Sequence, residues 1–185
     1  FTESCTFDPK RNLILSMNAG SREKGAKEDG YVSLINPDGS VHTAKWIGAS
    51  RDGLTLINPI GSALHDGVLY TVDSGFVRSF DLETGSPLRS IEIPGSGFLN
   101  GIAIADDGTA YVSDTRPGER VYKVPPDGDV SIFAVWQRFQ AGHGREDRGY
   151  CYGNPERRID VLRLGAAPVG DTDESEQCAG FCSAG

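Results

Sequence analysis

The chain has 185 residues, 38% of them hydrophobic and 24% charged, and this composition predicts a folded globular protein rather than a disordered one. Its 26 acidic residues exceed its 18 basic ones and give a net charge of -8. This acidic balance disfavours nucleic acid and anionic membrane surfaces as partners, and it favours cations or neutral small molecules. We expect no membrane span, because no apolar stretch is long enough to cross a bilayer.

The cysteines and the first residue give little information on the compartment. The chain begins at Phe1 rather than Met, which favours a processed chain or a fragment and leaves both a cytoplasmic and an exported location open. Three of the four cysteines lie in the last 35 residues, so a disulfide framework spread through the domain is not expected. Cys5 lies in an apolar strand pattern and is predicted to be a small buried side chain.

Two sets of turn motifs recur along the first 136 residues. The outer turns read NPDGS, LETGS and PPDGD and place glycines at 39, 85 and 128, which are 46 and 43 residues apart. The inner turns place glycines at 67 and 108, which are 41 residues apart, and DPKRN at 8–12 takes this role in the first copy. Glycine suits such hairpin turns because it adopts positive φ without a steric penalty. A period of this length is typical of repeat architectures.

Each repeat contains four short β-rich runs, and no helical period appears before residue 137. This pattern predicts an all-β fold, a partial β-propeller with three four-stranded blades at about 3–47, 53–95 and 98–136. Six blades of this size would require roughly 260 residues, so three of an expected six are present. The charged stretch at 19–30 is predicted to be a solvated loop in the first blade.

Residues 137–185 lack the repeat and are predicted to form an irregular, poorly ordered tail. All the basic residues of this tail are arginine, which suggests a sequence read out of frame or joined from elsewhere. Within it, 157–165 is a candidate for a strand or one helical turn. A zinc site from His143, Cys151, Cys178 and Cys182 is disfavoured, because closely paired cysteines are absent and free thiols are the simpler interpretation.

The order of motifs resembles the family of senescence marker protein, gluconolactonase and regucalcin. The similarity covers about residues 3–136 and rests on ESCTFDP, GYVSLINPDGSVHTAKWI, the segment INPIGSALHDGVLYTVDSGFVRSFDLETGSPLRSIEIPG, and FLNGIAIADDGTAYVSDT. The resemblance implies a six-bladed propeller that holds one divalent cation, usually calcium or zinc, at one mouth of its axial channel. It also implies an activity, mostly hydrolysis of lactones.

Residues that precede the innermost strands are the candidate site, because these strands converge on the propeller axis. In the three copies they are Glu3, Ile60 and Asn100. Carboxylate and amide oxygens suit calcium or magnesium. By the resemblance, Glu3 corresponds to a glutamate that binds the metal, and Asn100 to an asparagine that contacts substrate or water or the metal itself. The simpler alternatives are a solvated Glu3 and an Asn100 that serves only in a turn.

Other polar residues receive structural assignments or none. Asp73 and Asp114 recur at the ends of the second strands, and we predict that each binds a nearby backbone amide rather than acting in catalysis. GSGFLNG at 95–101 leads into a strand, so it is not interpreted as a phosphate loop. The histidines lie in unrelated contexts, and no catalytic residue can be named.

Two functions from different classes remain open. The first is a metal-dependent lactonase or esterase that acts on a small lactone or ester, with calcium as the first choice of cation and zinc or magnesium as alternatives. In such an enzyme the cation polarises the carbonyl, water attacks, and a pocket carboxylate handles the proton. The later metal ligands of the family are missing, so activity of this chain alone stays open. The second is a non-catalytic half-propeller of NHL type that binds partners or self-associates through open blade faces.

Overall fold

The computed structural model describes residues 2–20, 29–48, 55–116, 119–136 and 151–153. The predicted loop at 19–30 lies mostly outside these residues, as do the segment 157–165, His143, Cys178 and Cys182. Three antiparallel sheets form the described fold. The first contains β1 (Thr2–Asp8), β2 (Leu13–Asn18), β3 (Tyr31–Ile35) and β4 (Val41–Gly48) in this order. The second contains β5 (Pro59–His65), β6 (Val68–Asp73), β7 (Phe76–Asp81) and β8 (Pro87–Glu92).

The third sheet contains β9 (Leu99–Ile104), β10 (Ala110–Asp114), β11 (Arg120–Val124), β12 (Ser131–Trp136) and one strand that the sequence did not predict. This strand is β13 (Cys151–Gly153), which pairs antiparallel with β12 through three residue pairs. Apart from it, each sheet has four strands in chain order, as predicted. No helix occurs in the described residues, so none there is long and apolar enough to span a membrane.

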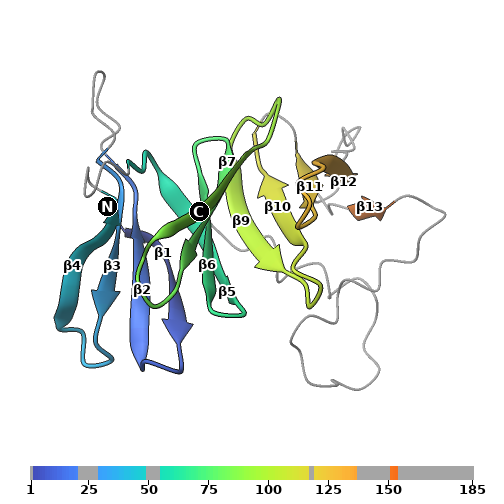
Figure 1. The fold of residues 1–185 in the computed structure, drawn as a ribbon. Helices are drawn as coiled ribbons and strands as arrows, with labels where there is room; N and C mark the ends of the chain where they lie inside the picture. The colour runs from blue at the N-terminus through green and yellow to red at the C-terminus, as the bar shows by residue number, and fades with distance from the viewer. Residues whose placement is uncertain (1, 21–28, 49–54, 117–118, 137–150, 154–185) are drawn as a thin grey trace, which may run out of the picture.

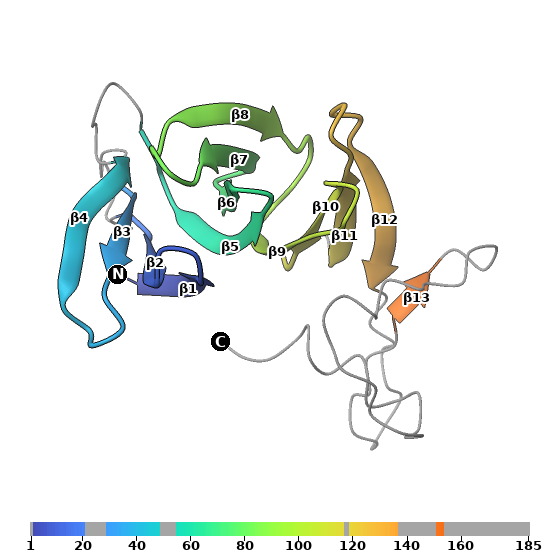
Figure 2. The ribbon, with the colours of Figure 1, turned by 60° about the horizontal axis from the view of Figure 1, so that its bottom comes forward.

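The three sheets stand next to one another in chain order (Figure 1), and they fan about a common centre (Figure 2). In the view of Figure 2, β1, β5 and β9 lie on the inner side of the fan, whereas β4, β8 and β12 lie on the outer side. We call the sheets blade 1, blade 2 and blade 3 in chain order. Because their inner strands follow one another around one centre, the arrangement is that of neighbouring blades in a propeller, and the predicted fold class is confirmed.

Turn chemistry explains the sharp hairpins within each blade. The five glycines of the repeated turns all have positive φ, between 74° and 96°, as the motifs predicted. In the inner hairpin of blade 2, both Asp66 (φ 45°) and Gly67 (φ 74°) have positive φ, and His65 pairs with Val68 across them. A two-residue turn of this kind matches the right-handed twist of the strands that it joins.

The blades are held together by two apolar clusters, one at each blade interface. The cluster between blades 1 and 2 includes Leu15, Leu69 and Phe80, all at most 1% exposed. The cluster between blades 2 and 3 includes Val72 and Val112, both fully buried. Burial of apolar area between stacked sheets therefore fixes the angle of the fan.

Cys5 corrects one prediction, because it is exposed rather than buried and makes no disulfide. It lies on β1, which pairs only with β2 and is therefore an edge strand. The β1 face that carries Cys5 and Phe7 has no cover from the described residues, and Phe7 is 50% exposed. The apolar pattern of β1 indicated a strand correctly, but it could not show which face another blade covers.

Candidate functional site

The residues predicted at the inner rim occupy equivalent positions in the structure. Thr2, Pro59 and Leu99 pair with the last residue of the second strand in blades 1, 2 and 3, respectively. Glu3, Ile60 and Asn100 each come one residue later. The register thus aligns the three residues that the sequence singled out.

All three inner strands are irregular at this rim. In blade 1, Thr2 and Ser4 pair with the adjacent residues Asn18 and Met17, so Glu3 is an extra residue on β1. In blade 2 the three-residue step from Pro59 to Ser62 opposes a two-residue step on β6. In blade 3 the three-residue step from Leu99 to Ile102 opposes a two-residue step on β10, so β5 and β9 each carry one extra residue as well. A β-bulge changes the direction of the side chains at the bulge, and bulges are common beside functional sites. The turn motifs gave no signal for these bulges.

Direct contacts connect the three bulged segments. The Ser4 hydroxyl donates a hydrogen bond to the Ile60 carbonyl, which joins β1 to β5. A Cβ atom on Gly61 would overlap the Asn100 carbonyl oxygen and would lie only 3.0 Å from the Gly101 Cα, so β5 and β9 touch backbone to backbone there. Only glycine allows this approach. Ile60 therefore lies between Glu3 and Asn100 along one rim.

The rim supplies oxygen donors from two side chains, both on exposed residues. Glu3 carries a carboxylate and Asn100 a carboxamide. Calcium prefers six to eight oxygen ligands, so these residues fit its chemistry but supply only part of its shell. Zinc prefers imidazole and thiolate, which the three rim positions do not offer. Among the described residues no group of three or more His, Cys, Asp or Glu could hold a metal ion, so any remaining ligands would be water, substrate or other parts of the protein.

Asp73 and Asp114 have the structural role that their recurrence predicted. The Asp73 carboxylate accepts hydrogen bonds from the amides of Ile57 (2.9 Å) and Asn58 (2.6 Å), and one from Arg78 Nε at 2.8 Å. Asp114 accepts from the amides of Gly97 (3.0 Å) and Phe98 (2.8 Å). Both carboxylates are at most 1% exposed. Each aspartate lies at the end of the second strand of its blade and binds the backbone that leads into the innermost strand of the same blade.

Asp8 plays a comparable role at the inner turn of blade 1. It is 2% exposed and accepts hydrogen bonds from the Lys10 amide (3.0 Å), the Arg11 amide (3.3 Å) and Arg11 Nε (2.5 Å). Burial alone would raise the pKa of Asp8, but these bonds and the Arg11 charge together hold its pKa below the ordinary value. The Arg11 guanidinium also stacks on the Trp46 ring, 5.0 Å from its centroid.

Comparison with known proteins assigns no function to the chain. No family model matches it, and no curated protein does either. A computationally designed protein, Ika4, aligns at 14% identity and a TM-score of 0.38, over 72% of this chain and 66% of its own. A Thermus thermophilus protein provisionally named an oxidoreductase (glucose dehydrogenase) aligns at 21% identity and a TM-score of 0.41, over 71% of this chain and 44% of its own. The chain thus spans less than two thirds of either structure, and its own sheets define a propeller-like fold.

Proposed function

We propose that the inner rim binds a divalent cation, calcium in the first instance, and that this site serves hydrolysis of a small lactone or ester in a propeller that includes this chain. The observation that carries the proposal is the shared bulge, which brings Glu3, Ile60 and Asn100 to one rim. A carboxylate and an amide oxygen there are hard ligands, and the net charge of -8 favours a cation. The family resemblance of residues 3–136 points to the same chemistry.

The two rim side chains have different parts in this proposal. Glu3 holds the cation through its carboxylate, and it projects from an extra residue of β1. Asn100 has both an acceptor oxygen and a donor NH₂, so it either completes the cation shell or orients the substrate by donating to a substrate oxygen. A divalent cation bound at this rim would polarise the carbonyl group of the substrate. No residue is assigned to proton transfer.

Calcium titration of the full chain, after treatment with a chelator, tests the proposal. A cation that binds only the folded state at 100 times its Kd adds about 2.7 kcal/mol of stability, which for a chain of this size raises the Tm by about 5–10 °C. Glu3→Gln removes the charge at nearly constant volume and should abolish this rise. Glu92→Gln makes the same change on the exposed outer strand β8 and should retain it. An equal rise in wild type and Glu3→Gln would overturn the site.

A second function, a non-catalytic binding module, is favoured by exposed apolar side chains in blades 1 and 3. Phe7 on β1 and Val41 on β4 are 50% and 63% exposed, and Ile132 and Val135 on β12 are 53% and 42% exposed. Such side chains favour association with another chain or a second copy. Analytical ultracentrifugation distinguishes the two functions: calcium-independent self-association that Phe7→Ser weakens, together with a calcium-insensitive Tm, supports the module.

A further inference from the structure

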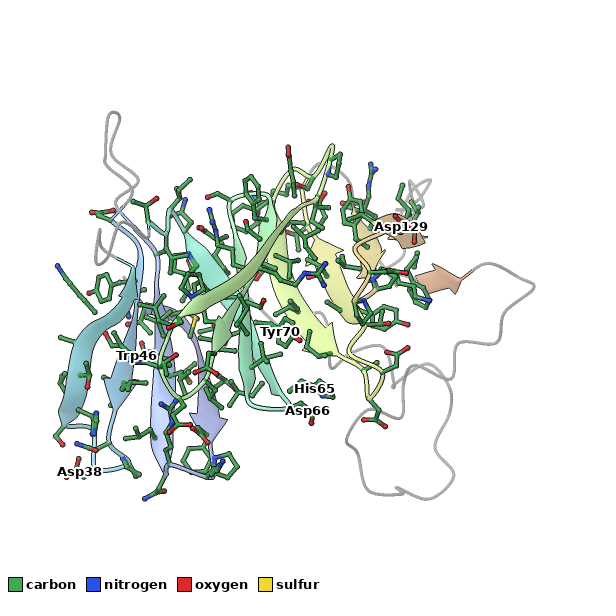
Figure 3. All side chains as sticks on the ribbon, viewed as in Figure 1. Asp38, Trp46, His65, Asp66, Tyr70 and Asp129 are labelled. Atoms are coloured by element: carbon green, nitrogen blue, oxygen red, sulfur yellow. The ribbon has the colours of Figure 1, made fainter. Side chains whose placement is uncertain are left out.

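A cavity of about 330 Å³ lies between blades 2 and 3, at the end of the strands opposite the candidate cation site. The inner hairpin turns of both blades border it, with His65 and Asp66 from one and Asp106 and Asp107 from the other. Figure 3 shows His65 and Asp66 at the far end of β5, with Tyr70 beside them. Its volume is within the range of small-molecule sites.

The repeat itself shows why this interface is hollow while its neighbour is filled. In each blade the second and third strands are joined next to one residue pair: Asn18 with Tyr31 in blade 1, Asp73 with Phe76 in blade 2, and Asp114 with Arg120 in blade 3. Counting residues along the strands from these pairs matches each position of one blade with a position of the next. Three matched positions are large at the interface of blades 1 and 2 and small at that of blades 2 and 3. These pairs are Leu34 and Ser79, Leu69 and Ala110, and Phe80 and Val124.

Residues of the outer strands also make the interface of blades 1 and 2 more filled than that of blades 2 and 3. In blade 1 a register shift in β4 accompanies Trp46, which is 8% exposed and packs against Gly85 in the outer turn of blade 2. In blade 2 the matching contact is made by Arg89, whose guanidinium lies near Gly128 and donates to the Pro126 carbonyl. An indole thus fills the first interface, whereas a guanidinium bound to a carbonyl borders the cavity at the second.

Ser79 places a polar group on the otherwise largely apolar wall of the cavity. It is 5% exposed and lines the cavity, yet its hydroxyl has no hydrogen bond within the described part of the chain. The Ser79 oxygen is not among the fully buried polar atoms that lack a partner, so it keeps contact with solvent in the cavity, where water or a polar ligand group can bind it. A ligand with a polar group near Ser79 would supply the partner.

The charges around the cavity select the type of ligand. Its lining includes the carboxylates of Asp66, Asp106 and Asp107. The basic groups are the Arg89 guanidinium, which already binds the Pro126 carbonyl, and the His65 imidazole, whose Nε2 lies 3.5 Å from the Asp66 carboxylate. The Asp107 carboxylate accepts a hydrogen bond from the Thr109 amide (2.9 Å), which lowers its pKa and keeps it ionised. The walls between these groups are apolar or aromatic, with Tyr70 available for a cation–π contact.

We propose that this cavity is a binding site for a small organic cation, a protonated amine with an apolar or aromatic body. The body lies against Tyr70 and the apolar walls, and the ammonium group faces the carboxylates of the two hairpin turns. The Ser79 hydroxyl gains a polar partner from the ligand. The site is independent of the inner rim, because Glu3 and Asn100 lie at the other end of the strands.

Binding of three matched probes to the full chain at neutral pH tests this proposal. Benzylamine, benzyl alcohol and benzoate share one aromatic body and differ in charge. A fragment of eight heavy atoms is expected to bind with a Kd of about 1–20 mM. We expect NMR titration to show benzylamine binding about tenfold more tightly than benzyl alcohol, and benzoate more weakly than both. Equal affinity for the three probes, or no saturable shift with benzylamine up to about 50 mM, would refute the site.

Substitutions locate the binding. Ser79→Leu introduces the residue type of Leu34, the matched position in blade 1, and should weaken benzylamine binding at least tenfold because the larger side chain fills the cavity. If this variant fails to fold, Ala110→Leu, which copies Leu69, provides the same test. Asp106→Asn should weaken benzylamine about two- to fivefold and leave benzyl alcohol unchanged.

Two controls separate this cavity from other surfaces. Asp38→Asn lies in the outer turn of blade 1 and should change nothing. Glu3→Gln should leave benzylamine binding intact, whatever its effect on calcium, so failure of the rim and failure of the cavity are distinguishable. Benzylamine binding that survives both Ser79→Leu and Ala110→Leu would contradict the proposal.

Discussion

Replacing the aspartate at the end of the second strand should destabilise blade 2 more than blade 3. Asp73 accepts two backbone amides and Arg78 Nε, whereas Asp114 accepts two backbone amides and, within the described residues, no arginine. Asp73→Ala therefore leaves two amides and a guanidinium without their acceptor, and Asp114→Ala leaves two amides. Comparing these two variants therefore measures how much the bond to Arg78 contributes to the free energy of unfolding.

The expected magnitudes follow from these partners. Removing one member of a buried ion pair costs about 3–5 kcal/mol, because the other charge stays buried without compensation. The Asp73 carboxylate is fully buried, and the Arg78 side chain is 20% exposed, so we expect the whole cost of Asp73→Ala, its two amides included, to lie in the lower half of that range, about 3–4 kcal/mol. Removing the acceptor of two partly buried amides costs about 2–3 kcal/mol. Asp73→Ala should thus exceed Asp114→Ala by about 1 kcal/mol.

Urea unfolding followed by far-ultraviolet circular dichroism measures both values. A double-mutant cycle with Arg78→Ala should return a coupling energy of about 1–2 kcal/mol for Asp73 and Arg78. Asp73→Asn, which keeps one acceptor oxygen, should retain part of the stability. A change of less than about 0.5 kcal/mol in the free energy of unfolding of Asp73→Ala, the usual range of a surface substitution, would refute the structural role of Asp73.

Two further substitutions test the inner turn and the rim. Because the folded-state pKa of Asp8 is lowered, its contribution is present above the unfolded pKa of about 3.9 and is lost as the pH falls through the folded value. Asp8→Asn should therefore reduce the loss of Tm seen on acidification below about pH 4 in wild type; an unchanged acid profile would contradict this. Gly61→Ala forces β5 away from the Asn100 carbonyl and should cost about 1–3 kcal/mol in urea unfolding, and a neutral result would show that the contact between the two strands is loose.

The sequence predicted the blades because their signals are local. Asp-Gly and Thr-Gly turns fix where each hairpin reverses, and all five glycines at these turns have positive φ. Cys5 and β13 show the limit of such signals. The exposure of Cys5 depends on which face of β1 another blade covers, and the pairing of β13 with β12 is an edge contact between segments far apart in the chain. Neither property is encoded in a short window of residues.

The rim was predicted in part, and the cavity was not predicted. The repeat placed Glu3, Ile60 and Asn100 at matching positions, which the register bears out, but the bulges that redirect them depend on pairing with the second strands. Their role as ligands remains a proposal. For the cavity, a signal did exist in the repeat: Ser79 stands where the first copy has Leu34. A comparison of matched core positions would have revealed it, whereas a search for motifs could not.

The two proposed sites differ in how the fold makes them possible. At the inner rim the bulges interrupt regular pairing in every blade, so this end can present extra residues toward the centre without loss of the remaining ladder. At the opposite end of blade 2 the strands β5, β6 and β7 pair regularly and only the outer strand β8 shifts register, beside Ser79, so a site arises where core side chains are replaced by smaller ones. Truncating a packed apolar side chain costs stability because neighbours collapse only partly. A propeller-like fold can carry that cost at one interface because the adjacent interface, filled by Trp46, Leu34 and Phe80, is packed independently.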